Sequence, residues 1–234
     1  MRKNGSRLIS IQQYKATDLF LFALILIVFE VLNFFAVTKW FVGAAFFTFS
    51  LAIPICVVVM MRWGWISIIY AVCDGLFYCL MLCIQYNQSG NIFEWFRWIQ
   101  YGIGGAFIAL TMVYFHFVGK ERIRQSWWLS ALSVVIAWIS VMLGRSIMYS
   151  ACTGENFVGV LLSILSTDFL SMVIGVVVIL VLRKLDGMFE DQKLYLARLD
   201  KEKRDKMQRD TFGDGPVEIN EELLSAFNDN NDLY

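Results

Sequence analysis

Residues 158–182 read VGVLLSILSTDFLSMVIGVVVILVL, an unbroken apolar stretch in which Asp168 is the single ionisable side chain. A helix needs roughly 20 mainly apolar residues to cross the hydrocarbon core of a bilayer, so this stretch is long enough to span a membrane. It does not alternate apolar and polar residues with period two, as a transmembrane barrel strand does. Because only helices and closed barrels satisfy their backbone polar groups in lipid, we interpret the stretch as a transmembrane helix.

Five further apolar stretches of similar length precede it, and polar residues separate them. They cover residues 19–37, 43–61, 66–84, 99–118 and 127–148. The chain as a whole is 58% hydrophobic, whereas roughly 45–50% is typical of soluble domains. We therefore predict an all-α integral membrane protein, folded as a six-transmembrane-helix bundle.

Charged residues are concentrated outside these stretches and divide the chain into four predicted segments. Residues 1–18 form an N-terminal segment, and residues 19–184 form the six-span membrane domain. Residues 185–210 are predicted to form an amphipathic, charged helix, because apolar residues recur there at helical spacing. Residues 211–234 are acidic and contain no Lys or Arg, which is typical of a disordered tail.

The distribution of basic residues predicts the orientation of the spans. Loops on the cytoplasmic side carry an excess of Lys and Arg. With the N-terminus inside, only Lys39, Arg97 and Arg145 fall on the outer side, and the inner segments carry Arg2, Lys3, Arg7, Lys15, Arg62, Lys120, Arg122, Arg124, Arg183 and Lys184. We therefore expect a multi-pass protein of the cell (plasma) membrane, with both termini in the cytoplasm.

Ionisable side chains inside the predicted spans identify a candidate binding site. Insertion of such a group costs at least about 2.5 kcal/mol, so it normally faces other helices, water or a ligand. Glu30, Arg145 and Asp168 all fall in the outer half of their spans. We interpret them as the lining of a polar, substrate-binding pocket open to the outside, with Trp95 and Arg97 of the preceding aromatic loop at its lip.

Other interpretations of these residues remain open. Arg145 and Asp168 would equally suit a structural ion pair that holds the fifth and sixth spans together. Asp74, near the middle of the third span, has no evident partner, and we expect it to be protonated and hydrogen-bonded. Gly102 and Ala106 follow the small-xxx-small pattern of closely packed membrane helices, so we assign them to helix packing.

The sequence contains no recognisable catalytic or metal-binding motif. The single histidine, His116, and five cysteines without a C-x-x-C pair argue against a zinc or iron–sulfur site. The glycines at 102–105 follow no strand and lack the lysine of a phosphate-binding loop. We expect neither an enzyme nor a cofactor, and no nucleic-acid partner; any ATP-driven work requires another subunit.

Several stretches resemble a known family of membrane proteins. They are SLAIPICVVVMMRWG at 50–64, GKERIRQS at 119–126, LGR at 143–145, STD at 166–168 and, most specifically, LDGMFEDQKLYL at 185–196. Over residues 17–200 the chain resembles substrate-binding S components of energy-coupling factor (ECF) transporters, and in particular an uncharacterised S-component-like group of Firmicutes proteins.

The resemblance implies a small, high-affinity binder of a vitamin or similar micronutrient. Such a protein docks on a membrane T subunit that carries two cytoplasmic ATPases, and substrate contacts come from outer loops and the outward half of later spans. Docking in the family uses small residues of the first span, whereas Ala23 is the only small residue between positions 22 and 30 here. No vitamin-specific motif is present, so the substrate is not predicted.

Two alternatives to transport follow from the same sequence. The first is a non-transporting scaffold, similar to the multi-pass membrane subunits of bacterial cell-shape machinery, in which the acidic tail recruits partners. The second, a membrane enzyme, has no supporting motif. An arginine at the site suits an anionic ligand, whereas Glu30 and Asp168 suit a cationic one, and the sequence does not decide between them.

Overall fold

The computed structural model describes residues 11–36, 50–88, 92–185 and 187–212. These residues form helices joined by short connections and contain no strand, which confirms the all-α prediction for the described part of the chain. The chain divides into two compact units, Met1–Gln192 and Lys193–Tyr234. The larger unit contains every predicted span.

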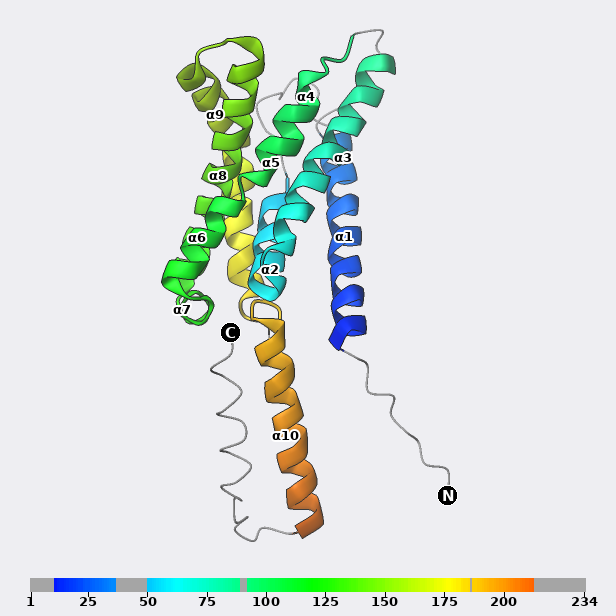
Figure 1. The fold of residues 1–234 in the computed structure, drawn as a ribbon, viewed down its shortest axis with the longest axis vertical. Coiled ribbons are helices and arrows are strands. Elements are labelled where there is room, and N and C mark those ends of the chain that lie inside the picture. Colours follow the sequence, from blue (N-terminus) through cyan, green and yellow to red (C-terminus); the bar gives the residue numbers. More distant parts are fainter. Residues whose placement is uncertain (1–10, 37–49, 89–91, 186, 213–234) are drawn as a thin grey trace, which may run out of the picture. The chain divides into compact units, whose positions relative to one another are not determined.

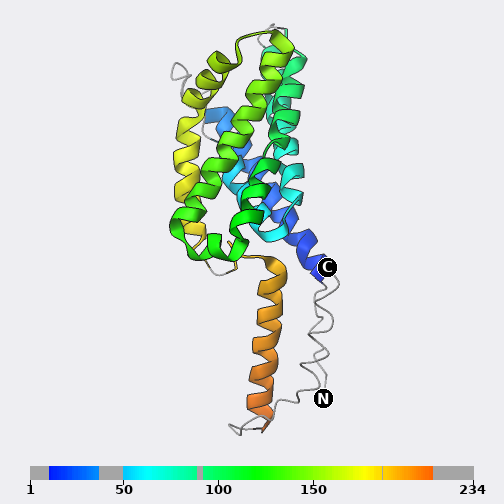
Figure 2. The same ribbon diagram turned by 60° about the vertical axis from the view of Figure 1, so that its left-hand side comes forward.

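The larger unit is a bundle of helices that run side by side (Figures 1 and 2). Five of its helical stretches are long and apolar enough to cross a membrane, as expected for a multi-pass membrane protein. Its elements are α1 (Ile11–Phe35), α2 (Ala52–Trp63), α3 (Ile66–Gln88), α4 (Phe96–Trp98), the π-helix η2 (Ile99–Ile103), α5 (Gly104–Ala106), α6 (Ala109–Val118), α7 (Lys120–Gln125), α8 (Trp127–Thr153) and α9 (Phe157–Leu182).

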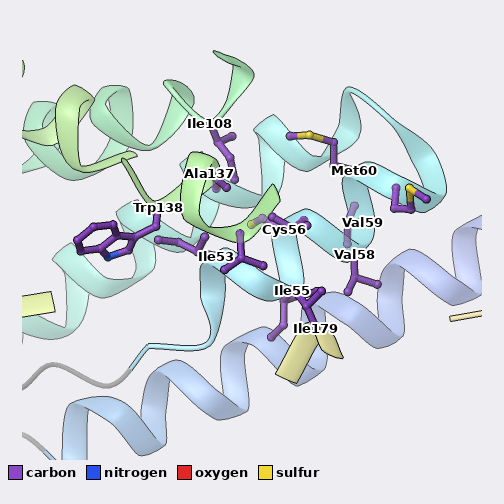
Figure 3. Close-up of a cluster of buried hydrophobic side chains, with 14 of the residues drawn as sticks. Ile53, Ile55, Cys56, Val58, Val59, Met60, Ile108, Ala137, Trp138 and Ile179 are labelled. Carbon is purple, nitrogen blue, oxygen red and sulfur yellow. The ribbon is translucent and has the colours of Figure 1, made fainter. Parts of the chain in front are cut away.

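Helix α2 lies in the centre of this bundle. Every residue from Ala52 to Trp63 is buried. Figure 3 shows side chains of this helix clustered with Ile108, Trp138 and Ile179 from other parts of the bundle. A helix that is apolar on all sides belongs in such a core. The described helix has twelve residues, or about 18 Å, and residues 43–49 of the predicted second span lie outside the described part of the chain.

The outer faces of the long helices are apolar. Phe20 on α1 is 67% exposed and Val177 on α9 is 55% exposed. Soluble monomers rarely expose contiguous apolar surface, whereas lipid tails are as apolar as leucine and solvate it well. Further exposed residues of the same kind are Leu21, Leu24, Ile27 and Val28 on α1, and Leu162, Phe169, Val173 and Val181 on α9.

The segment that follows α9 differs from the prediction. We expected a helix from residue 185, but α10 (Gln192–Phe212) begins seven residues later. Gly187 adopts a positive φ of 72°, a conformation that ends a helix and that glycine reaches without strain. The Nε2 of Gln192 donates a hydrogen bond to the Gly187 carbonyl at 2.7 Å, so a side chain satisfies this backbone group.

A cluster of charged and polar side chains holds this segment against the start of α1 and the end of α2. Arg62 is only 4% exposed and pairs with Asp18 at 2.6 Å. It also donates to the carbonyl of Gly187, and Trp63 Nε1 donates to Asp18 at 2.6 Å. We call Asp18, Arg62, Trp63 and the Gly187 carbonyl the Arg62 cluster.

Ion pairs extend the attachment to α7. Lys120 pairs with Asp191 at 2.5 Å, and Arg124 approaches Glu190 at 3.7 Å. Glu190 and Asp191, both within residues 185–196, therefore tie the chain after α9 to the bundle.

The second unit begins with the remainder of α10. Within it Arg198 lies over the ring of Tyr195, 5.4 Å from its centroid, and approaches Glu202 at 4.0 Å. The predicted acidic tail at 211–234 falls, from residue 213 on, outside the described residues, as do residues 1–10 of the N-terminal segment.

Candidate functional site

A polar cavity of about 110 Å³ lies among the long helices. It contains four ionisable side chains from four different helices, and these are the four intramembrane charges predicted from the sequence. Neutral polar and two apolar residues complete its wall. The lining residues are Glu30, Asn33, Ser50, Asp74, Tyr78, Gln100, Tyr101, Met142, Arg145, Ile164, Thr167 and Asp168.

Glu30 accepts hydrogen bonds from two side chains, one on its own helix and one just before α2. It is 3% exposed; the hydroxyl of Ser50 donates to Oε1, and Asn33 Nδ2 donates to Oε2 at 3.4 Å. Ser50 Oγ also accepts a hydrogen bond from the Ala52 amide at 3.1 Å, at the start of α2. The serine therefore joins the carboxylate of α1 to the first turn of the central helix.

Asp168 is held in a similar way on α9. Trp138 Nε1 of α8 donates to Oδ2 at 2.8 Å, and Ser171 Oγ donates to Oδ1 at 3.0 Å. Ser171 Oγ in turn accepts from the Ser50 amide at 3.0 Å. A chain of hydrogen bonds thus connects Glu30 to Asp168 through Ser50 and Ser171.

Arg145 is held by packing rather than by an acidic partner. Its guanidinium lies 5.1 Å from the centroid of the Tyr101 ring, within the range of a cation–π interaction. Among the described residues it forms no salt bridge and no hydrogen bond, and its Nε is buried without a partner. The ion pair between Arg145 and Asp168 that we considered from the sequence is not formed.

Glycines allow the close backbone approaches that frame the cavity. A Cβ at Gly104 would lie 2.9 Å from the Arg145 backbone, and a Cβ at Gly75 would lie 2.1 Å from the Tyr101 carbonyl oxygen. Any side chain at these positions would displace Arg145 or Tyr101. A Cβ at the predicted packing residue Gly102 would lie 2.9 Å from the Leu76 side chain, whereas one at Gly105 would lie 2.6 Å from the Ala71 carbonyl oxygen.

The π-helix η2 contributes two of the lining residues, Gln100 and Tyr101. π-Helical turns are rare and are frequently found at functional sites. Tyr101 also contacts Tyr78 of α3, with ring centroids 5.2 Å apart. The sequence analysis did not identify these residues, because neutral polar side chains in an apolar run carry no signal comparable to a charge.

Asp74 lies in the wall of the cavity. It is 3% exposed, and its Oδ1 is buried and unpaired among the described residues. The hydrogen bond predicted for this aspartate is not found among the described residues. Its carboxyl instead lies with Glu30, Arg145 and Asp168 around one space.

Trp95 and Arg97 do not line this cavity. Trp95 is 70% exposed. Arg97 pairs with Glu94 at 3.0 Å and lies over the rings of Tyr86 and Phe96. The predicted lip is thus a local aromatic and ionic cluster whose arginine is already paired.

A second cavity of about 260 Å³ adjoins the first and shares Gln100 and Ile164 with it. It extends to Tyr149 and Glu155, at the turn between α8 and α9. This turn is formed by Gly154, with a φ of 76°, and by Asn156, whose side chain caps α9. The second cavity therefore reaches from two wall residues of the first cavity to this end of the bundle.

The chain matches no protein-family model, no curated protein and no solved structure.

Proposed function

We propose that this chain is a substrate-binding S subunit of an ECF-type uptake transporter, which captures a small micronutrient in the polar cavity. The observation that carries the proposal is the state of Arg145. Among the described residues, the buried Nε of Arg145 has no hydrogen-bond partner, and neither do the buried oxygens Asp74 Oδ1 and Gln100 Oε1 in the same cavity wall. Leaving a buried polar atom unpaired costs about 1–3 kcal/mol. Such a wall suits a ligand better than it suits a structural clamp.

The proposal includes the topology expected from the sequence. The helix that contains α2 is the second of six spans, both termini are cytoplasmic, and the protein resides in the plasma membrane. In this orientation the turn between α8 and α9 faces outward, and the second cavity leads from it to the buried charges. The expected partners are a membrane T subunit and its two ATPases.

The alternative is a membrane scaffold. A scaffold needs no polar cavity, and its buried charges would pair with one another. Glu30 and Asp168 accept hydrogen bonds from separate donors, and Arg145 forms no salt bridge within the described part of the chain, which favours the binding subunit.

A thermal-shift screen of the purified protein tests the proposal. Ligands would be water-soluble vitamins, their precursors and nucleobases. A ligand at one hundred times its dissociation constant stabilises the folded state by about 2.7 kcal/mol. We expect a concentration-dependent rise in the melting temperature with one chemical class, lost in Arg145→Ala. A flat screen at millimolar ligand would remove the proposal and leave the scaffold.

A further inference from the structure

Three buried polar atoms in the wall of the polar cavity have no hydrogen-bond partner among the described residues. They are Asp74 Oδ1, Gln100 Oε1 and Arg145 Nε. Asp74 is 3% exposed and Gln100 is 6% exposed. Buried polar groups of folded proteins are nearly always hydrogen-bonded, so unpaired atoms from three residues around one space indicate that a bound molecule supplies the missing bonds.

The three atoms differ in what they require. The carbonyl oxygens of carboxyl and amide side chains accept hydrogen bonds, whereas the Nε of an arginine only donates. A ligand that satisfies Asp74, Gln100 and Arg145 together therefore carries two donors and one acceptor. A carboxylate supplies acceptors alone and an ammonium group supplies donors alone, so neither group matches this wall.

Close backbone contacts fix the positions of these residues. A Cβ at Gly75, the neighbour of Asp74, would lie 2.1 Å from the Tyr101 carbonyl oxygen, and a Cβ at Gly104 would lie 2.9 Å from the Arg145 backbone. The elements that carry the three residues, α3, η2 and α8, thus pack tightly beside them. Groups that are held in place before a ligand arrives lower the entropic cost of binding.

The volume of the cavity limits the size of the ligand group. Its 110 Å³ is somewhat less than the roughly 150 Å³ of an engineered cavity that accepts benzene. A five-membered ring is therefore of suitable size. Gln100 also lines the second cavity of about 260 Å³, so a substituent on the ring would extend past this residue toward Tyr149 and Glu155.

We propose that the cavity binds a ureide group, –NH–CO–NH–, of a small cyclic ligand. Its two N–H groups donate to Asp74 Oδ1 and Gln100 Oε1, and its carbonyl oxygen accepts from Arg145 Nε. The assignment rests on the proposed function and specifies its substrate class. It requires the oxygen of the Asp74 side chain and not a charge there.

The same pairing predicts which compounds the site rejects. Water can bond to each of these atoms, so a ligand that displaces it must reproduce the bonds. A site built to hydrogen-bond a substrate N–H discriminates strongly against an analogue that lacks the group. A ring that keeps the carbonyl and loses its N–H groups should therefore bind poorly.

Three neutral probes of nearly equal shape test the donors without a change of charge. Imidazolidin-2-one, pyrrolidin-2-one and cyclopentanone are five-membered rings with one carbonyl and with two, one and no N–H groups. Dissociation constants for the full-length protein in detergent would be measured by ligand-observed NMR, with protein-free micelles as the reference. We expect imidazolidin-2-one to bind at least tenfold more tightly than cyclopentanone, with pyrrolidin-2-one between them.

Matched variants locate the binding. Asp74→Leu and Gln100→Met nearly keep the size of the side chain and remove the acceptor, and each should weaken imidazolidin-2-one binding at least tenfold. Asp74→Asn keeps a carbonyl oxygen and should bind within threefold of the natural chain. Gln125→Met is the control, because the exposed Gln125 side chain donates to Glu121 on α7, away from the cavity, and it should leave binding unchanged.

The outcomes distinguish this assignment from the function on which it rests. The ureide assignment is overturned if imidazolidin-2-one does not bind, if cyclopentanone binds as tightly, or if binding is unchanged in either Asp74→Leu or Gln100→Met. A hit without a ureide or cyclic amide in the vitamin screen would then keep the binding-subunit proposal, whereas a flat screen would remove both.

Discussion

Glu30 and Asp168, on the first and last long helices of the bundle, are connected through two serines. The Ser50 hydroxyl donates to Glu30, the Ser50 amide donates to Ser171 Oγ at 3.0 Å, and the Ser171 hydroxyl donates to Asp168 at 3.0 Å. One short segment before α2 thereby fixes the positions of two carboxylates that are far apart in the sequence. The geometry of the cavity depends on this chain of hydrogen bonds.

Ser171→Ala is expected to weaken that connection. The substitution removes one donor from Asp168 and leaves the Ser50 amide without its acceptor, at a cost of about 1–3 kcal/mol in the free energy of unfolding. Thermal unfolding in detergent would measure the loss. Ser166→Ala on the same helix is the matched control, because the exposed Ser166 hydroxyl donates to the Ser163 carbonyl of its own helix and to no other described residue. Equal melting temperatures for the two variants would contradict the prediction.

Substitution of Arg145 distinguishes a role in ligand binding from a role as a structural clamp between α8 and α9. Because Arg145 has no ion-pair partner among the described residues, Arg145→Ala should lose ligand binding while the melting temperature without ligand falls little. The clamp instead predicts a clear loss of stability, rescued in part when Asp168→Asn is added. Melting temperatures of the two single variants and the double variant, each measured with and without ligand, complete this test. Partial rescue by Asp168→Asn would count against the site.

The charged members of the site were predictable from the sequence, and its neutral members were not. Glu30, Arg145 and Asp168 stand out because an ionisable group is rare inside an apolar run. Tyr78 and Gln100 carry no such signal. Their place in the wall follows from the π-helix and from glycine contacts between helices, which depend on tertiary structure.

Two other expectations illustrate the same limit. Arg97 lies in an aromatic loop typical of a membrane interface, but its i,i+3 neighbour Glu94 satisfies it locally. The apolar pattern from residue 185 resembles an amphipathic helix, yet Phe189 is buried in a non-helical segment whose backbone carbonyls bond to Arg62. The periodicity of apolar residues does not reveal that a side chain distant in the sequence competes with a helix for the backbone carbonyls of the segment.

The glycine contacts predict opposite effects for two alanine substitutions. Gly75→Ala would place a methyl group 2.1 Å from the Tyr101 carbonyl oxygen, and overpacking of this kind costs about 1–3 kcal/mol. Gly159→Ala meets nothing within 4 Å in helix α9, and should stabilise the protein by about 0.5–1 kcal/mol because alanine favours helix. Thermal unfolding of both variants checks the signs. The contact assignment is wrong if Gly75→Ala is as stable as the natural chain.

The Arg62 cluster predicts the largest loss of stability. Arg62→Ala leaves Asp18, whose side chain is 12% exposed, as a buried charge without its main partner, and breaking such a pair costs about 3–5 kcal/mol. Asp18→Asn in the same chain should recover part of the loss, because it removes the uncompensated charge. Arg97→Ala is the control, since its pair with Glu94 is half exposed and surface pairs contribute about 0–1 kcal/mol.

Because the cluster also anchors the Gly187 carbonyl, Arg62→Ala should in addition increase protease cleavage between residues 183 and 192. Unchanged cleavage there, together with a melting temperature near that of Arg97→Ala, would show that the cluster does not hold this segment against the bundle.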